Sequence, residues 1–255
     1  MSGITINGDN VFFIVGGQRC GTTYLYNLLE KHPSICLAKP SFPHPKYFIN
    51  QDKKDINYLN YFSKYFKHYN PSNTIFGEVS TSYYEIEQCP EIIASTFPNC
   101  KIIFILRNPV ERAISNYHFN IDNGIESRSA EDALSKCNMS SNDWNKNYSV
   151  DPYNYLARGE YHIFINNYQK QFDKSQIKIL YFNEIHNHNI FQSEIYSFLN
   201  IENVFHNDKK INKNSSKTEY EIPTHVINFL NNYYKETIYE LNKMDCIDIN
   251  RLITK

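Results

Sequence analysis

The chain has 255 residues, of which 41% are hydrophobic and 21% are charged. This composition is that of an ordinary globular protein and excludes a disordered or fibrous chain, and the length suits a single domain over residues 1–255. The formal net charge of −1 excludes a broadly basic surface for nucleic acid, although a local basic site is compatible with it.

The first predicted unit is a strand, a glycine-rich turn and a helix. Val11–Val15 is a continuous apolar run, which predicts a strand buried on both faces. A turn with three glycines follows at 16–21, and Thr22–Lys31 carries leucines at helical spacing and ends before Pro33. This order of elements is typical of the start of a doubly wound α/β fold.

The same alternation continues along the chain. Further strands are predicted at Thr74–Val79, Lys101–Leu106 and Ile177–Phe182. Further helices are predicted at Pro90–Phe97, Pro109–Phe119, Tyr155–Phe172 and Ile190–Leu199, and within Pro223–Met244. Strands that alternate with helices predict a doubly wound, mainly parallel central sheet with helices on both faces, in P-loop-like form.

Two polar stretches are predicted to be loops. Ser127–Pro152 is the candidate for a lid or an insertion that binds an acceptor. His206–Lys217 contains four lysines, Lys209, Lys210, Lys213 and Lys217. This second stretch is either a solvated basic loop or a clamp on an anionic ligand.

The turn after the first strand has the features of a phosphate site. Backbone N–H groups and the helix dipole favour an anion at a helix N-terminus. Gly21 permits close backbone approach, Thr22 and Thr23 add hydroxyl donors, and Arg19 adds a planar fork of N–H donors. A P-loop nucleoside triphosphatase has Lys after the second glycine, whereas Thr22 stands there, and no apolar strand ends in an Asp for magnesium. The turn therefore indicates phosphate binding without a metal, with a ligand-free tight turn as the alternative.

A second candidate site follows the strand at 101–106. Arg107 stands at the carboxyl end of this strand, where open α/β sheets bind their ligands. Ser115 lies eight residues further on, and its spacing from Arg112 places both on one face of the next helix. Taken alone, Arg107 could be a cation that caps the helix, and Ser115 a surface serine.

Together these motifs resemble those of sulfotransferases that use 3′-phosphoadenosine-5′-phosphosulfate (PAPS). Gln18-Arg-Cys-Gly-Thr-Thr23 resembles the 5′-phosphosulfate loop of this family. Arg107-Asn-Pro, followed by Arg112 and Ser115, resembles its 3′-phosphate signature, with the same Arg-to-Ser interval. Three further segments resemble less specific motifs of the carbohydrate, heparan-type and bacterial branch of this family: Gly77–Tyr83, Tyr155–Tyr161 and Ile179–Glu184.

The resemblance implies a nucleotide site with two ends. The residues that would hold the 5′-phosphosulfate are Gln18, Arg19, Cys20, Gly21, Thr22 and Thr23. Arg107 and Ser115 would hold the 3′-phosphate, and Arg19 would also be catalytic because it touches the bridging oxygen and the sulfonate. PAPS would be the co-substrate and PAP the product, with no metal required.

The resemblance leaves the catalytic base open. Glycan-modifying relatives carry a Glu shortly after the first helix, and in Pro43-His-Pro-Lys-Tyr-Phe48 the matching position holds His44. An imidazole can accept a hydroxyl proton, so His44 is one candidate base. Glu78, at the end of a predicted strand, is the second, and the third possibility is that neither acts. Lys46 is a further cation near the predicted sulfonate position.

The function predicted by this resemblance is transfer of sulfonate from PAPS to an acceptor hydroxyl, and the expected acceptor is a carbohydrate. The alternatives are a catalytically impaired protein that binds PAP or PAPS, and a P-loop kinase. The N-terminus lacks a leader pattern, and the run at 11–15 is too short to span a membrane. We therefore expect a cytoplasmic protein with reduced cysteines, no membrane span and no nucleic-acid partner.

Overall fold

A five-stranded parallel sheet forms the centre of the molecule. The computed structural model describes residues 8–42, 44–49, 56–135, 148–204 and 220–253. The strand order is β2-β3-β1-β4-β5, and every neighbouring pair is parallel. The strands are β1 (Val11–Gly16), β2 (Ile35–Leu37), β3 (Ile75–Val79), β4 (Lys101–Leu106) and β5 (Ile177–Tyr181). The predicted α/β class with a parallel sheet is confirmed.

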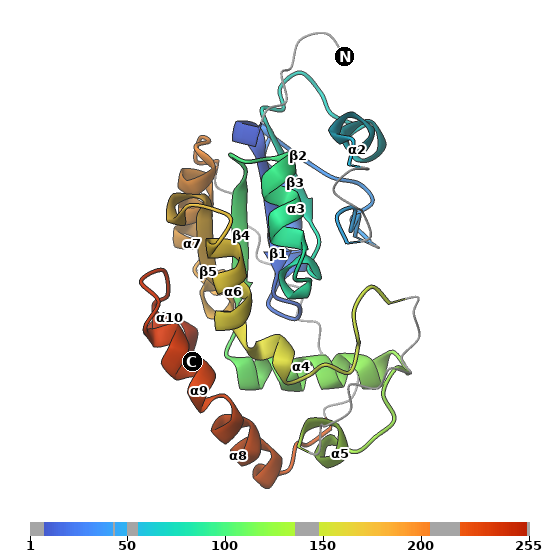
Figure 1. Ribbon diagram of the computed structural model, residues 1–255, viewed down its shortest axis with the longest axis vertical. Helices are drawn as coiled ribbons and strands as arrows, with labels where there is room; N and C mark the ends of the chain where they lie inside the picture. The colour runs from blue at the N-terminus through green and yellow to red at the C-terminus, as the bar shows by residue number, and fades with distance from the viewer. Residues whose placement is uncertain (1–7, 43, 50–55, 136–147, 205–219, 254–255) are drawn as a thin grey trace.

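Helices cover both faces of the sheet (Figure 1). One face packs against α1 (Thr22–Leu29) and α7 (His188–Leu199). The other packs against α2 (Tyr58–Tyr65), α3 (Cys89–Thr96) and α6 (Tyr161–Gln169). In Figure 1, α4 (Pro109–Asp122) lies across the lower ends of the strands, with α5 (Ala130–Leu134) and α8 (Thr224–Tyr233) beyond it. The chain continues through α9 (Lys235–Asn242) to α10 (Ile249–Ile253).

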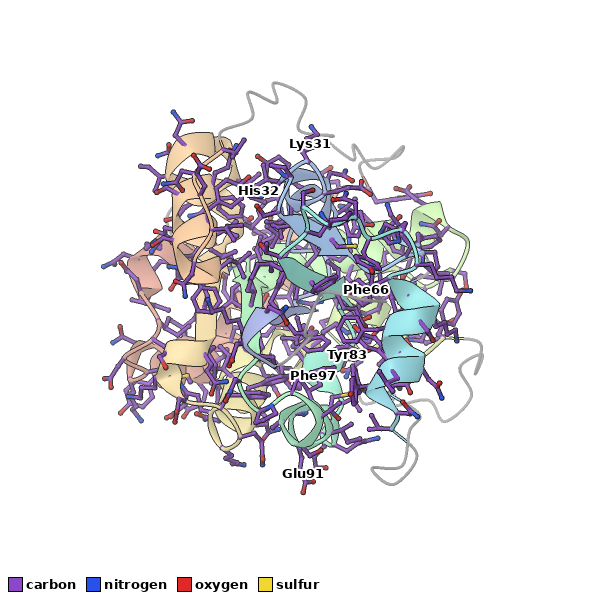
Figure 2. The ribbon with its side chains drawn as sticks, turned by 90° about the horizontal axis from the view of Figure 1, so that it is seen from above. Lys31, His32, Phe66, Tyr83, Glu91 and Phe97 are labelled. Atoms are coloured by element: carbon purple, nitrogen blue, oxygen red, sulfur yellow. The ribbon has the colours of Figure 1, made fainter. Side chains whose placement is uncertain are left out.

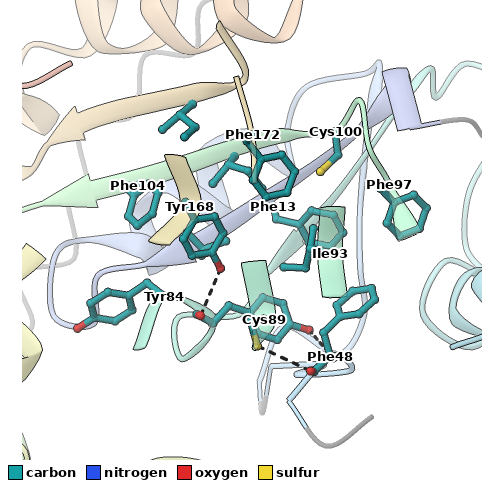
Figure 3. Packing of buried hydrophobic residues seen from close by; sticks show 14 of the residues in the cluster. Phe13, Phe48, Tyr84, Cys89, Ile93, Phe97, Cys100, Phe104, Tyr168 and Phe172 are labelled. Carbon is teal, nitrogen blue, oxygen red and sulfur yellow. Dashed lines mark hydrogen bonds between the residues drawn. The ribbon is translucent and has the colours of Figure 1, made fainter. Parts of the chain in front are cut away.

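The central strand β1 is buried along its whole length, as its apolar run predicts. Its alternate side chains enter opposite hydrophobic cores, because successive side chains of a strand point to opposite faces. Phe12 and Ile14 lie in the core under α1 and α7, and Phe13 lies in the core under α3 and α6. Figure 3 shows Phe13 near Phe48, and their ring centroids are 5.6 Å apart. The 44–49 segment is thereby fixed to the centre of the sheet.

The same core is rich in aromatic rings. Figure 2 shows Phe66, Tyr83 and Phe97 inside the molecule, whereas Lys31 and Glu91 project outward. All three of these aromatic side chains are at most 3% exposed. Much of the chain's aromatic content therefore serves packing and is not available on the surface.

Several elements differ from those predicted. β2, α2 and α10 were not expected, and the predicted helix Tyr155–Phe172 is a 3-10 turn, η4 (Ala157–Gly159), followed by α6. The predicted loop Ser127–Pro152 contains α5, which forms because Ser129 accepts a hydrogen bond from the Asp132 N–H and because Ala133 and Leu134 are buried. Residues 136–147 of that stretch, and all of His206–Lys217, lie outside the described residues.

None of the helices in the described ranges combines the length and apolar character that a membrane crossing requires. The five cysteines in these ranges, Cys20, Cys36, Cys89, Cys100 and Cys246, carry free thiols.

A cross-strand contact between β3 and β1 gives a test of the fold. Gly77 pairs with Phe12, and a methyl group on Gly77 would lie 2.1 Å from Phe12 Cζ. We expect Gly77→Ala to lower the free energy of unfolding by about 1–3 kcal/mol, because the added methyl group overpacks the core. Phe12→Leu makes room for the added methyl group. The free energy of unfolding lost in the double variant should therefore be smaller, by at least about 0.5 kcal/mol, than the sum of the losses in the two single variants. Urea denaturation measures all three, and strictly additive losses would contradict this packing.

Candidate active site

The strand order places two loops side by side at one edge of the sheet. β1 is central, with β3 and β2 on one side and β4 and β5 on the other, so the order reverses between β1 and β4. Ligands of open α/β sheets bind at such a reversal, beyond the carboxyl ends of the strands. The turn 17–21 follows β1, and Arg107 follows β4. The Gly17 N–H donates to the Ile105 carbonyl at 2.8 Å, which ties the turn to β4.

The turn after β1 is shaped by two left-handed residues. Gly21 has φ 91°, and a methyl group there would lie 2.5 Å from Ile185 Cδ1, so only glycine fits. Arg19 has φ 65°, a conformation that costs a non-glycine residue about 1 kcal/mol and that is typical of functional turns. Thr22, which is buried, and Thr23, which is exposed, open α1. Their N–H groups have no partner within the helix and are available to an anion.

The two motifs predicted from the sequence meet through Arg19 and Ser115. Arg19 Nε donates to Ser115 Oγ at 3.4 Å, and the guanidinium carbon lies 4.4 Å from the centroid of the Phe119 ring. Ser115 and Phe119 both belong to α4, whose start is fixed because the Asn108 side chain accepts the Val110 and Glu111 N–H groups. The turn after β1 and the helix after β4 therefore form one site.

Two positive charges face each other in this site. Burial, and after it the charge of Arg107, lower the pKa of Arg19. Arg107 pairs with Glu111 at 3.2 Å and lies over the Phe182 ring at 4.4 Å. Within the described residues, Arg19 has no carboxylate at ion-pair distance. An anion between the two guanidinium groups would relieve their repulsion, so the site is suited to a phosphate or sulfonate.

Gln18 and Cys20 face the protein interior. Gln18 Nε2 donates to Glu85 Oε1 at 2.9 Å. The Cys20 thiol is fully buried and lies 3.7 Å from the Tyr161 hydroxyl, which itself donates to the Arg107 carbonyl at 2.9 Å. Burial raises the pKa of Cys20, so its side chain packs as a neutral thiol. Tyr161 thus connects the turn after β1 to the end of β4.

A second segment, 44–48, rests on the loop that follows β3. The Lys46 N–H donates to Ser80 Oγ at 3.0 Å, and the Phe48 N–H donates to the Tyr83 hydroxyl at 3.2 Å. The Phe48 and Tyr83 rings also pack edge to face, with their centroids 5.8 Å apart. Lys46, like Arg19, is a non-glycine residue with positive φ, here 51°. The segment is held at the carboxyl edge of β3, beside β1 in the sheet.

His44 lies in this segment as a neutral imidazole. Its Nδ1 accepts the Thr81 N–H at 3.5 Å. Burial, and after it the charge of Lys46, lower the pKa of His44 to about 4. With Nδ1 accepting, the proton of the neutral ring sits on Nε2. To accept a proton at Nε2, the ring must first take the tautomer with hydrogen on Nδ1 and give up the long Thr81 contact.

Glu78 is placed differently from the other predicted residues. It is 1% exposed, and the hydroxyl groups of Tyr61 and Ser80 donate to its carboxylate. Burial raises the pKa of Glu78. Because Ser80 also accepts the Lys46 N–H, Glu78 supports the 44–48 segment from below. Arg19, Arg107 and Ser115 come together, whereas Glu78 lies inside β3.

Residues that sequence reasoning missed surround the predicted ones. Phe119 and Phe182 lie against Arg19 and Arg107, and Glu85 and Arg158 form a buried ion pair behind Gln18. Arg158 lies in the Tyr155–Tyr161 landmark, which the sequence indicates without giving any residue in it a role. A charged residue between Ala157 and Gly159 was the one available signal.

Comparisons with known proteins agree with this architecture. Residues 9–228 match a family model described as Sulfotransferase domain. The chain is 31% identical over 120 residues to the membrane-associated sulfotransferase kil1 of Dictyostelium discoideum, covering 43% of this chain and 23% of that protein. It is 38% identical over 114 residues to the bifunctional heparan sulfate N-deacetylase/N-sulfotransferase 3 of Homo sapiens, covering 42% and 12% respectively. The chain thus spans less than a quarter of the length of these curated relatives.

A solved structure shares the fold over nearly the whole chain. The sulfotransferase from Alicyclobacillus acidocaldarius superposes with a TM-score of 0.72 at 22% identity, covering 94% of this chain and 95% of that one.

The lowered pKa of His44 predicts a pH dependence of stability. The unfolded chain takes up this proton near pH 6.5 and the folded chain only near pH 4, so the unfolded state holds more protons between these values. The free energy of unfolding should therefore fall as the pH falls through this range, by on the order of 3 kcal/mol for this group. His44→Gln should flatten that part of the curve in urea denaturation. An identical slope in the variant would show that the ring titrates normally.

Proposed function

Because this chain belongs to the sulfotransferase domain family, we propose that it transfers a sulfonate group from PAPS to an acceptor hydroxyl. The observation that carries the proposal is the meeting of two anion-binding motifs at neighbouring strand ends, with Arg19 Nε 3.4 Å from Ser115 Oγ. One motif suits each phosphorylated end of a single nucleotide.

The roles follow from the chemistry of each group. The N–H groups and hydroxyls of Thr22 and Thr23 bind the 5′-phosphate, and Arg107 with Ser115 binds the 3′-phosphate. Arg19 binds the bridging oxygen and the sulfonate. Among the described residues, its donors have only the long Ser115 contact and the Phe119 ring to give up when the nucleotide enters.

The transfer step forms one bond and breaks another. The acceptor oxygen attacks sulfur while the bond from sulfur to the phosphate oxygen breaks, and PAP leaves with the electron pair. Negative charge grows on the phosphate oxygen, where Arg19 stabilises it. The acceptor proton passes to a base, for which we propose His44 after the change of tautomer described above. Glu78 then acts only through the segment that carries His44.

A second candidate function is binding of PAP or PAPS without transfer. The observation that favours it is the state of His44, because an imidazole with a pKa of about 4 and its Nδ1 engaged by Thr81 is a weak base. Nucleotide binding does not depend on this side chain, so the two functions differ only in turnover.

For the acceptor we propose a carbohydrate. The support is the similarity to a protein named for heparan sulfate N-sulfotransferase activity, over 42% of this chain. Because that name specifies N-sulfation, a glycan amine is the alternative acceptor to a glycan hydroxyl. An assay with hydroxyl and amine acceptors of otherwise equal structure separates these two possibilities.

Nucleotide binding tests the two arginines separately. We expect Arg19→Ala and Arg107→Ala each to weaken PAP binding in calorimetry by at least about tenfold, because each removes charged hydrogen bonds to an anion. Arg107→Ala should leave affinity for AMP unchanged, since AMP lacks the 3′-phosphate. Arg128→Ala, which removes an arginine paired with Glu126 instead, is the control.

Two results would contradict this assignment. Equal weakening of PAP and AMP by Arg107→Ala would remove the 3′-phosphate role. Stabilisation by magnesium ATP but not by PAP in thermal melting would favour a kinase.

Turnover tests the base. With labelled PAPS and matched hydroxyl and amine glycans, His44→Ala should lower kcat about 100-fold or more while leaving PAP affinity unchanged. Because the pKa of His44 is about 4, the wild-type kcat/KM should be flat above about pH 5 and fall toward pH 4. His225→Ala, whose ring is exposed on α8, is the control. PAP binding without transfer to any acceptor would favour the second candidate function.

A further inference from the structure

Arg158 is a fully buried arginine that contacts three separate segments. It lies in η4 and is 1% exposed. Its Nε donates to both carboxylate oxygens of Glu85 at 3.0 Å, its Nη1 donates to Asn116 Oδ1 at 3.0 Å, and its Nη2 donates to the Asp151 carbonyl at 2.6 Å. Each nitrogen of the guanidinium group thus donates to an acceptor, and these acceptors are far apart in sequence.

The first contact leads to the turn after β1. Glu85 Oε1 accepts from Arg158 and also from Gln18 Nε2, at 2.9 Å. Gln18 is the residue directly before Arg19. The position of the turn therefore depends on a carboxylate whose own position is set by Arg158.

The second contact leads to the helix that carries Ser115. Asn116 Oδ1 accepts from Arg158 and also from Arg112 Nη1, at 3.2 Å. Asn116 is 3% exposed and adjacent to Ser115, so this double contact fixes the rotation of α4 about its axis. That rotation directs Ser115 toward Arg19.

The third contact leads to the 148–151 segment. Asp151 receives the Nη2 hydrogen bond, and Ser149 Oγ lies 3.2 Å from Ser82 Oγ, in the loop after β3. The neighbouring Thr81 contacts His44. The same guanidinium group therefore also holds a segment on the side of the proposed acceptor.

The cluster also carries charge. The side chains of Arg112, Arg158 and Glu85 are each more than nine-tenths buried, and Arg112 has no carboxylate at ion-pair distance among the described residues. The positive charge of Arg112 acts on both Arg19 and Cys20 in the turn after β1. In a buried position, such a charge favours an anion at the turn.

We infer that Arg158 is a positioning residue for the transfer reaction: its guanidinium fork sets the relative position of the turn after β1, of α4 and of the 148–151 segment. This inference rests on the proposed function, because the turn and α4 are the two halves of the nucleotide site. Arg158 touches neither substrate, and it acts through Gln18, Asn116 and Asp151.

Arg158→Lys keeps the charge but replaces the fork by a single ammonium, which cannot reach three segments at once. We expect its affinity for PAP in calorimetry to fall by about tenfold or more, with a matching rise in KM for PAPS. A merely structural role would lower the fraction of folded protein, and so the apparent kcat, while leaving the dissociation constant of the folded fraction unchanged. Arg128→Lys is the matched control, because Arg128 also donates two hydrogen bonds to a glutamate, Glu126. This variant should bind PAP as the wild type does.

If Arg158→Lys does not fold, the double variant Arg158→Met with Glu85→Met replaces the ion pair by two apolar side chains. Removing both partners of a buried pair is tolerated better than removing one. We expect this protein to fold and to bind PAP about tenfold more weakly or worse, because Gln18 has lost its acceptor.

The outcomes separate the two proposals. PAP affinity within twofold of wild type in either folded variant would overturn the role of Arg158 and leave the proposed function standing. A wild-type protein that does not bind PAP would overturn the proposed function, and the role of Arg158 with it.

Discussion

The rest of the site depends on two like charges held at adjacent strand ends. The parallel pairing of β1 with β4 brings Arg19 and Arg107 to the same edge of the sheet, where burial and their mutual repulsion lower the pKa of Arg19. Each guanidinium lies 4.4 Å from the centroid of an aromatic ring, Phe119 or Phe182. An aromatic face attracts a cation without occupying its N–H groups, so the two rings stabilise both charges and use up none of their hydrogen-bond donors.

The parts of this site that depend on local sequence could be predicted from it. The apolar runs of β1 and β4, the glycines of the turn, and the Asn108-Pro109 start of α4 each signal one element. β2 has only three residues, too few for a periodicity to appear. The break between η4 and α6 comes from packing, because Gly159 lies against the ring of Tyr234, more than seventy residues away in the chain. Partners at such separations leave no local pattern.

The 44–48 segment shows the limit of reasoning by motif. A motif places His44 where relatives have Glu, but the chemistry of the side chain is decided by its surroundings. Burial and Lys46 keep the ring neutral, and Thr81 selects which nitrogen carries the proton. The position of Glu78 near a strand end predicts a place in the site, yet its carboxylate is enclosed by hydroxyl groups inside β3. The direction of a side chain within its strand decides whether it reaches the site. A strand boundary that is known only to within one residue does not give that direction.

The buried ion pair of Arg158 and Glu85 is better explained by geometry than by stability. Desolvation of two charges offsets most of their attraction, and an apolar pair of similar volume stabilises a core about as well. An apolar pair, however, cannot accept the Gln18 amide, engage Asn116 and hold the Asp151 carbonyl in fixed directions. Hydrogen bonds from one planar fork impose distances and angles on every segment they reach. A reaction that needs both ends of a nucleotide and an acceptor in register requires this directional constraint, which hydrophobic packing alone does not supply.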